Sequence, residues 1–163
     1  MRYLPVILLG LLGMSAMAAT DTTTFYFVDV GHGNSTFVIA PSGEVMVLDA
    51  GPPQSARRIL DFMAQNGIAK IDYMLVTHFE GDHMGAVGQM AAKVPIANYV
   101  DHGENVTYGK NDDWWRERRG PWMRGNGWGR HSDQLFDEYR QARNQGHYIP
   151  VKPDTKNHLN AKY

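Results

Sequence analysis

The sequence predicts a layered α/β protein, because its hydrophobic pattern changes twice along the chain. Short aromatic and β-branched runs come first, as in TFYFVDV and STFVIA, and such runs are typical of strands. An apolar stripe with helical spacing follows, and then the continuous apolar run IDYMLVT, which indicates a buried strand. Strands that alternate with helices in this way are typical of layered α/β folds, in which ligands gather at strand ends.

Residues 1–18 have the pattern of a secretory signal peptide. Arg2 supplies a short basic region, LPVILLGLLGM is an apolar run too short to span a bilayer, and Ala16 and Ala18 form a small-x-small cleavage site. An uncleaved membrane anchor is the alternative. Cleavage would leave residues 19–163 as one domain, which we expect to be secreted or periplasmic and to have no further contact with the membrane.

The mature chain offers neither thiols nor a strong charge. The sequence has no cysteine, so no disulfide braces the fold and no thiolate can act as a ligand or nucleophile. Loss of Arg2 with the signal peptide would leave 15 basic against 17 acidic residues. This near-balance gives no electrostatic signal for nonspecific binding to nucleic acid.

Three strands are expected at the start of the domain. They cover residues 24–30, 35–40 and 44–51, and the turn sequences GHGN and PSGE separate them. Turns this short join neighbouring strands that run in opposite directions. The sequence therefore predicts an antiparallel meander of three strands.

The next elements alternate between helix and strand. Apolar residues recur with helical spacing from Ala56 to Ala64, and Asn66-Gly67 is a plausible stop. The run IDYMLVT (71–77) is too apolar to be half exposed, so we expect a strand buried on both faces. A helix over MGAVGQMAA and a strand over IANYV (96–100) complete the pattern.

The heptapeptide THFEGDH directly follows the apolar strand and contains His78, Glu80, Asp82 and His83. Imidazole and carboxylate are ligands that zinc, iron and manganese accept. Residues 78, 80 and 82 alternate in a tight loop, so they can point at one centre. The alternative is a simple helix start, with Asp82 as the N-cap and His78 on the surface.

From about Phe25 to Val100 the chain resembles the metallo-β-lactamase superfamily. The motif HxExDH between a strand and a helix looks like that family's HxHxDH. FVDVGHGNST resembles the first hairpin of its hydrolase and competence-protein branches, and VMVLDAG resembles the strand whose last aspartate lies beneath the metals. The resemblance implies an αββα sandwich, of which this chain would hold the N-terminal part only and be incomplete at its C-terminus.

The resemblance also implies one or two metal ions, usually zinc, at one edge of the sheets. His78 would bind the first ion, and Asp82 and His83 would bind the second. Asp82 would also orient the attacking water, and Asp49 would support the site through hydrogen bonds. Glu80 stands where the family usually has histidine, and because carboxylate oxygens suit harder ions, manganese or iron are further candidates.

Two functions follow from these expectations. The first is a secreted hydrolase that uses a metal-activated water on an ester, amide or phosphodiester, since zinc lowers the pKa of bound water from about 16 to about 7. The second is a non-catalytic or truncated remnant of such a hydrolase, acting if at all through a partner chain. It remains open because the later ligands that full-length members supply are not evident after Val100.

A third region could contact the substrate. His102 follows the strand IANYV, and Trp114 and Trp115 lie in the arginine-, tryptophan- and glycine-rich stretch 111–130. This stretch could pack on the core, cover the site as a substrate loop, or form an interface between chains. Half of a sandwich would leave an apolar sheet face uncovered, so we also expect a homo-oligomer or an aggregation-prone chain.

Overall fold

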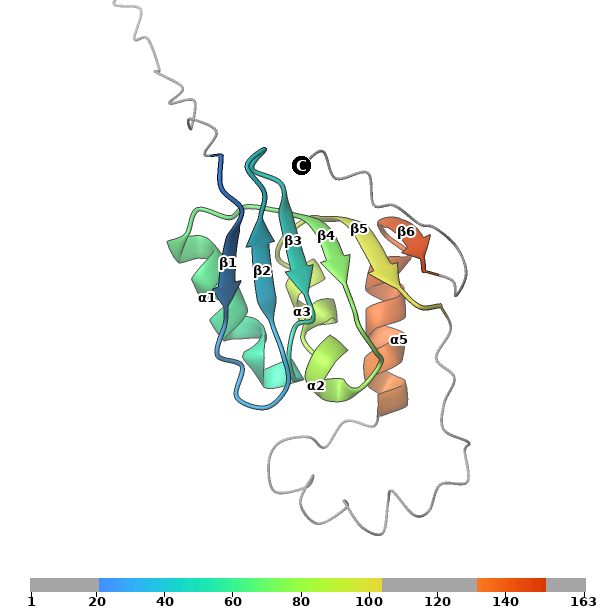
Figure 1. Ribbon diagram of the computed structural model, residues 1–163. Helices are drawn as coiled ribbons and strands as arrows, with labels where there is room; N and C mark the ends of the chain where they lie inside the picture. Colours follow the sequence, from blue (N-terminus) through green and yellow to red (C-terminus); the bar gives the residue numbers. More distant parts are fainter. Residues whose placement is uncertain (1–20, 104–131, 152–163) are drawn as a thin grey trace, which may run out of the picture.

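The structure, a computed structural model, describes residues 21–103 and 132–151. These residues form one six-stranded sheet with the strand order β1-β2-β3-β4-β5-β6 and helices packed against it (Figure 1). The mixed α/β class predicted from the sequence is confirmed. The strands are β1 (Thr24–Phe27), β2 (Thr36–Ile39), β3 (Val45–Leu48), β4 (Ile71–Leu75), β5 (Ile96–Asp101) and β6 (His147–Pro150), and the helices are η1 (Pro53–Ser55), α1 (Ala56–Gln65), α2 (Gly81–Met84), α3 (Val87–Ala91) and α5 (Ser132–Arg143).

The sheet changes character at β3. The pairs β1–β2 and β2–β3 are antiparallel, as the short turns predicted. The pairs from β3 to β6 are parallel, so each needs a crossover connection. Each new strand is added on the same side of the previous one, and crossovers are almost always right-handed. The helices therefore gather on one face of the sheet (Figure 1).

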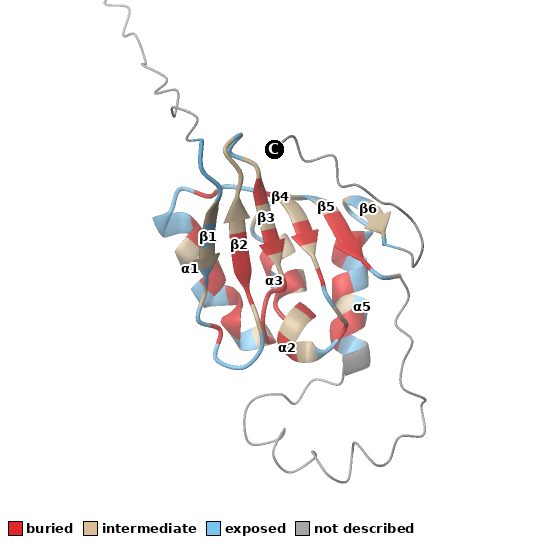
Figure 2. Cartoon of the chain, viewed as in Figure 1, coloured by how far each residue is buried: buried red, intermediate tan, exposed pale blue. Residues whose placement is uncertain are grey.

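The core lies between this helical layer and the sheet. Phe37, Val47, Met74 and Tyr99 stand opposite one another in adjacent strands, and all four are buried. Ile59 belongs to the same cluster, as does the rest of the buried face of α1. The helical stripe predicted from Ala56 onward thus packs against the sheet as expected as far as Met63 (Figure 2), whereas Ala64 at its end is exposed.

The opposite face of the sheet is open in the part of the chain that the structure describes. On the edge strand, Phe25 and Phe27 are 58% and 81% exposed. In β4, Ile71 and Met74 are buried, whereas Tyr73 is only half-buried. The prediction that this strand is buried on both faces is therefore wrong for the described residues, because all crossovers place their helices on the other side.

The helix after the motif also differs from the prediction. A single helix was expected over MGAVGQMAA, but α2 begins at Gly81 inside the motif, and α3 begins only at Val87. Gly85 separates them and lies against Pro53, so that a β-carbon on this glycine would be 2.5 Å from the proline Cδ atom. This close contact with the preceding η1 turn fixes where the chain bends.

Several features predicted from the sequence lie outside the residues that the structure describes. The signal peptide 1–18, together with Trp114 and Trp115, lies outside the described residues. Within residues 21–103 and 132–151, no helix has the length and apolar character needed to cross a bilayer.

Candidate metal centre

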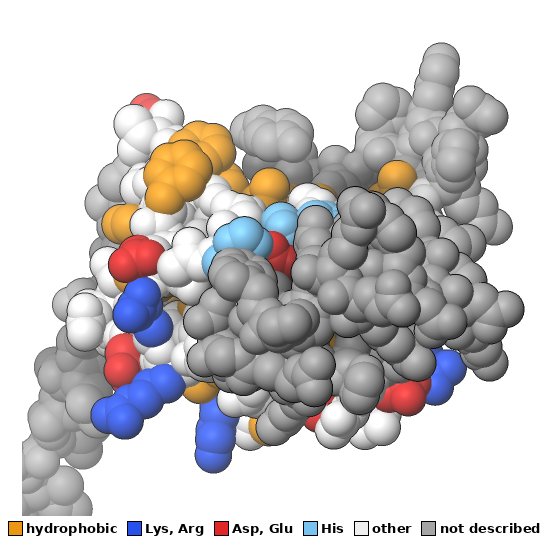
Figure 3. Space-filling model, turned by 90° about the horizontal axis from the view of Figure 1, so that it is seen from below, with side chains coloured by type: hydrophobic (Ala, Val, Ile, Leu, Met, Phe, Trp, Pro, Cys, Tyr) orange, Lys and Arg blue, Asp and Glu red, His pale blue; other side chains and the backbone are white. Residues whose placement is uncertain are grey.

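Three loops meet at the carboxyl edge of the sheet. Strands β1, β3 and β4 run in the same direction, so their C-terminal ends lie at one edge. The turn after β1 carries His32 and Asn34, the end of β3 carries Asp49, and the loop after β4 carries the THFEGDH motif. Seen from this edge, histidine side chains gather at the surface beside an acidic side chain (Figure 3).

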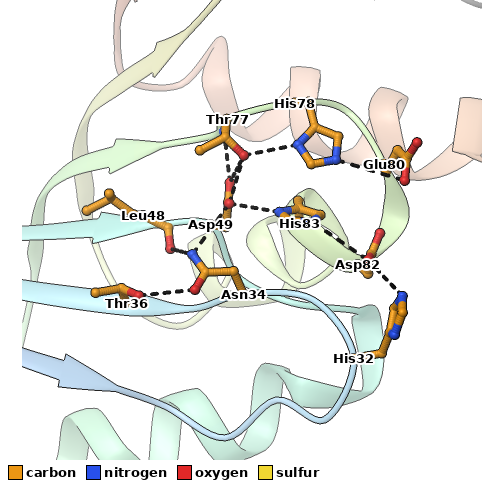
Figure 4. Close-up of polar contacts among 10 residues, drawn as sticks. All are labelled: His32, Asn34, Thr36, Leu48, Asp49, Thr77, His78, Glu80, Asp82 and His83. Atoms are coloured by element: carbon orange, nitrogen blue, oxygen red, sulfur yellow. Dashed lines mark hydrogen bonds and ion pairs between the residues drawn. The ribbon is translucent and has the colours of Figure 1, made fainter.

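Asp49 connects the sheet to the motif. One of its carboxylate oxygens accepts a hydrogen bond from the backbone N–H of Thr77 at 2.8 Å. The other accepts one from the Thr77 hydroxyl and lies 2.8 Å from Nδ1 of His83 (Figure 4). The Asp49 backbone has a φ of 58°, a left-handed conformation that is unfavourable for a residue other than glycine and that surrounding contacts must hold.

This contact fixes the orientation of the His83 ring. Because the Asp49 carboxylate only accepts hydrogen bonds, this contact selects the tautomer of the neutral imidazole in which Nδ1 carries the proton and Nε2 has the lone pair. Nε2 lies 3.6 Å from Oδ2 of Asp82. A histidine held at one nitrogen by a carboxylate, with the other nitrogen available, is the usual arrangement of a metal-binding imidazole.

Asp82 lies between two imidazoles. Its side chain is buried, and its Oδ2 atom is 3.2 Å from Nε2 of His32 in addition to its contact with His83. Asp82 is in the first turn of α2, whereas Glu80 takes the N-cap position without a capping bond from its side chain. The alternative interpretation of Asp82 as an N-cap is therefore wrong.

His78 and Glu80 complete the cluster on its outer side. The rings of His78 and His83 are in contact, with their centroids 3.9 Å apart and their planes tilted by 46°. His78 Nδ1 lies 3.1 Å from the Thr77 hydroxyl, and its Nε2 lies 3.9 Å from a carboxylate oxygen of Glu80. All four predicted motif residues and Asp49 thus lie in one cluster (Figure 4).

The donor atoms are of the kinds that bind a divalent ion, but they do not surround one common position. Imidazole nitrogens and carboxylate oxygens are ligands for zinc, manganese and iron. Among the residues that the structure describes, no three such side chains surround a single ion-sized position. Side-chain rotations would be needed for them to hold an ion.

Of the other predicted site residues, His102 is described and lies beside the motif loop. Its ring contacts that of Phe79, with 4.5 Å between centroids, and this contact does not bring it into the polar cluster. His32 and Asn34 were not predicted. Asn34 donates a hydrogen bond to the carbonyl oxygen of Leu48 at 3.1 Å. The only signal in the sequence was a pair of polar residues in a glycine-rich turn.

Known proteins resemble this chain over the same region. A family model described as the metallo-beta-lactamase superfamily matches residues 28–158. The chain belongs to the metallo-beta-lactamase superfamily. The resemblance seen in its motifs is therefore confirmed, and with it the assignment of the chain to a family of hydrolases.

Curated relatives in this superfamily match only in part. Endoribonuclease YSH1 of Saccharomyces cerevisiae is 32% identical over 77 residues, which are 44% of this chain and 10% of that protein. Lactamase-like protein notP of an Aspergillus species is 33% identical over 66 residues, or 39% of this chain and 20% of that protein. The chain thus spans a tenth to a fifth of the length of these relatives.

A solved structure matches more of the chain at lower identity. It is a provisionally assigned metallo-beta-lactamase from Thermotoga maritima, with a TM-score of 0.41 and 16% identity. The match covers 80% of this chain and 56% of that one.

Proposed function

We propose that this superfamily member is a metal-dependent hydrolase whose ion is held at the carboxyl edge of the sheet. The observation that supports it most strongly is the chain of contacts from Asp49 to Nδ1 of His83 and from its Nε2 to Asp82, at 2.8 and 3.6 Å. A buried carboxylate that orients an imidazole toward a second carboxylate is an arrangement typical of metal sites.

The motif residues act together as ligands in this proposal. His78, Glu80, Asp82 and His83 would hold one or two ions, with zinc the first candidate and manganese or iron made plausible by Glu80. When bound, such an ion lowers the pKa of water and polarises the substrate oxygen. Asp49 keeps His83 in the productive tautomer.

Asp82 is the proposed catalytic residue among the ligands. Its Oδ1 atom is not the one near His32 and His83, which is Oδ2. One carboxylate can therefore contact a cation through one oxygen and accept a hydrogen bond from water through the other. This would orient the water toward the substrate.

A phosphodiester is the first substrate class to test. The support comes from the relatives named endoribonuclease YSH1, one of which is 33% identical to this chain over 86 residues, because cleavage of RNA breaks a phosphodiester. An ester or amide stays the alternative, since a metal ion can activate water and polarise the substrate oxygen in both classes of reaction.

The apolar segment and cleavage pattern in residues 1–18 support a secreted or periplasmic location.

Metal content by mass spectrometry on the purified chain tests the proposal first. We expect about one or two ions per chain, and loss of metal in Asp82→Ala and His83→Ala. His147→Ala is the matched control, because His147 begins β6 at the opposite end of the parallel strands and bonds to Asn98. If the unaltered chain holds no more metal than the two motif variants, the proposal is wrong.

Hydrolysis of bis(p-nitrophenyl) phosphate by the metal-loaded chain then tests the substrate class, with p-nitrophenyl acetate as the ester comparison. Activity on the phosphate that disappears in Asp82→Ala is the expected result. Activity on the acetate alone would assign the chain to the ester class.

A non-catalytic remnant is the second candidate. It is favoured by one observation: Glu80 is 56% exposed and 3.9 Å from His78 rather than directed at Asp82. Metal bound without turnover of either substrate would support this reading.

A further inference from the structure

We propose that His32, in the turn between β1 and β2, is an additional metal ligand that completes the site together with Asp82 and His83. The inference rests on the proposed function, because it concerns the same ion. It adds to the predicted ligands a residue that lies 46 positions before the motif begins at His78.

The turn that carries His32 is anchored on both sides. Before it, an oxygen of the Asp29 side chain accepts a hydrogen bond from the backbone N–H of Gly31 at 2.9 Å, and Arg58 on α1 pairs with the same carboxylate at 3.2 Å. After it, the carbonyl of Asn34 accepts a hydrogen bond from the N–H of Gly51 at 2.8 Å. The turn is therefore placed by α1 and by the segment after β3 as well as by its own strands.

Gly33 brings this turn into direct contact with the motif helix. A β-carbon on Gly33 would lie 1.9 Å from the carbonyl oxygen of Asp82, and its φ of 98° also favours glycine. Only a residue without a side chain permits this approach. The result is that the imidazole one position earlier lies beside the Asp82 carboxylate.

The two separations from Asp82 to the imidazoles are each close to what one ion requires. Oδ2 of Asp82 is 3.2 Å from Nε2 of His32 and 3.6 Å from Nε2 of His83. Two ligand atoms bonded to one tetrahedral zinc ion at about 2.0–2.1 Å lie about 3.3–3.4 Å apart. Both observed separations are close to that value, and in both histidines it is Nε2 that faces the carboxylate (Figure 4).

The side chain that would have to move to bring the three donors together is that of His32. Its side chain is 62% exposed, whereas that of His83 is 21% exposed and fixed by Asp49. Among the described residues no three such side chains surround one ion-sized position, so coordination would require the His32 ring to turn toward the position that Asp82 and His83 share. The three donors would then form a His–Asp–His set drawn from two loops.

Measurement of zinc affinity would show whether His32 binds the ion or only forms an ion pair with Asp82. Zinc would be titrated into the full chain and into His32→Ala in competition with a chromogenic chelator, with His147→Ala as the matched control. We expect His32→Ala to weaken zinc binding at least about tenfold, the lower end of what loss of even an outer partner of a ligand produces. The control should keep the affinity of the unaltered chain.

The absorption spectrum of bound cobalt gives a second measurement that does not depend on activity. Loss of a ligand nitrogen should change the cobalt bands of His32→Ala, and circular dichroism would establish that the variant is folded. His32→Gln, which keeps a hydrogen-bonding side chain, should also lose affinity if coordination is the role.

The outcomes distinguish the two proposals. If Asp82→Ala and His83→Ala lose zinc but His32→Ala binds it with unaltered affinity and an unchanged cobalt spectrum, the metal site stands and the role of His32 is refuted. Retained affinity in His32→Gln alone would also refute coordination, leaving a hydrogen bond to Asp82. If the unaltered chain binds no zinc, both proposals fail together.

Discussion

At the scale of single residues, glycines decide which polar groups meet. Gly33 and Gly43 both have positive φ angles, 98° and 86°, and both lie in turns between strands of the meander. They differ in their surroundings. A β-carbon on Gly33 would meet Asp82 at 1.9 Å, whereas one on Gly43 would have nothing within 4 Å. The pair therefore separates the effect of backbone conformation from that of close packing.

Gly33→Ala should destabilise the protein more than Gly43→Ala. Both substitutions place a side chain in a left-handed conformation, but only the first also forces the turn away from the motif, which adds about 1–3 kcal/mol. Denaturant unfolding of both variants would measure the difference, and Gly33→Ala should also weaken metal binding. Equal losses of stability would mean that the turn does not need its contact with Asp82.

The sequence predicted the motif residues but not their partners in the first turn. The motif residues lie together in the chain, and their residue types indicate a metal site; they are His78, Glu80, Asp82 and His83. His32 reaches Asp82 only because two loops 50 residues apart approach at a glycine. A turn sequence such as GHGN predicts a change of direction, but it does not say which other loop the turn will touch.

At the scale of elements, one buried carboxylate joins the last three described elements. Asp101, at the end of β5, accepts hydrogen bonds from the hydroxyl of Tyr139 at 2.6 Å and from Arg143 at 3.0 Å, both on α5. Its other oxygen accepts one from the hydroxyl of Tyr148 on β6 at 2.8 Å. The Arg143 guanidinium also lies 4.1 Å from the centre of the Tyr148 ring.

Burial raises the pKa of the Tyr139 hydroxyl, and its hydrogen bond to Asp101 raises it further. The hydroxyl therefore remains a donor throughout the neutral range. The Arg143 guanidinium keeps its charge as well, because its pairing with Asp101 raises its pKa against the opposing effect of burial. The network thus has one acceptor carboxylate with three side-chain donors, and its integrity depends on that carboxylate.

Asp101→Ala should strongly destabilise the fold. The side chain of Arg143 is only 4% exposed, and removal of one partner of a buried ion pair costs about 3–5 kcal/mol. Asp137→Ala is the matched control, since Asp137 pairs with Arg140 on the same helix at the surface and such pairs contribute about 0–1 kcal/mol. Chemical denaturation would compare them, and similar losses would show that the buried network is not a major source of stability.

The sequence predicted the order of helices and strands better than it predicted the breaks and contacts between them. Local periodicity predicted the meander, α1 and the strands β4 and β5, because each of these patterns is contained in one segment. The break between α2 and α3 depends on Pro53 pressing against Gly85, which no local pattern records. The Asp101 network joins residues 38 to 47 positions apart, and a single buried aspartate gives no periodic signal.

At the scale of the whole molecule, the described fold has two unlike faces. Helices cover one face of the sheet, and half-buried apolar side chains with the exposed Phe25 and Phe27 occupy the other. Unpaired edges and exposed apolar faces favour association. We therefore propose that the chain self-associates through the open face, as expected from the resemblance to half of a sandwich.

Phe27→Lys should reduce self-association. The new charge would lie on the open face, where the side chain of Phe27 is 81% exposed, so it should disturb an interface with little effect on folding. Gln65→Lys adds the same charge to the exposed end of α1 on the helical side and serves as the matched control. Light scattering would measure molar mass, and a monomeric unaltered chain would exclude this interface.

The one-directional growth of the sheet has a consequence for the way the chain can be assembled. In the part of the chain that the structure describes, each strand after β1 pairs with the strand made just before it, so no early strand has to wait for a late one. During synthesis the N-terminal part of a chain is available before the C-terminal part has been made. The residues of the cluster from His32 to His83 have therefore all been made before β5, α5 and β6, so an ion held there as proposed could bind before those three elements dock.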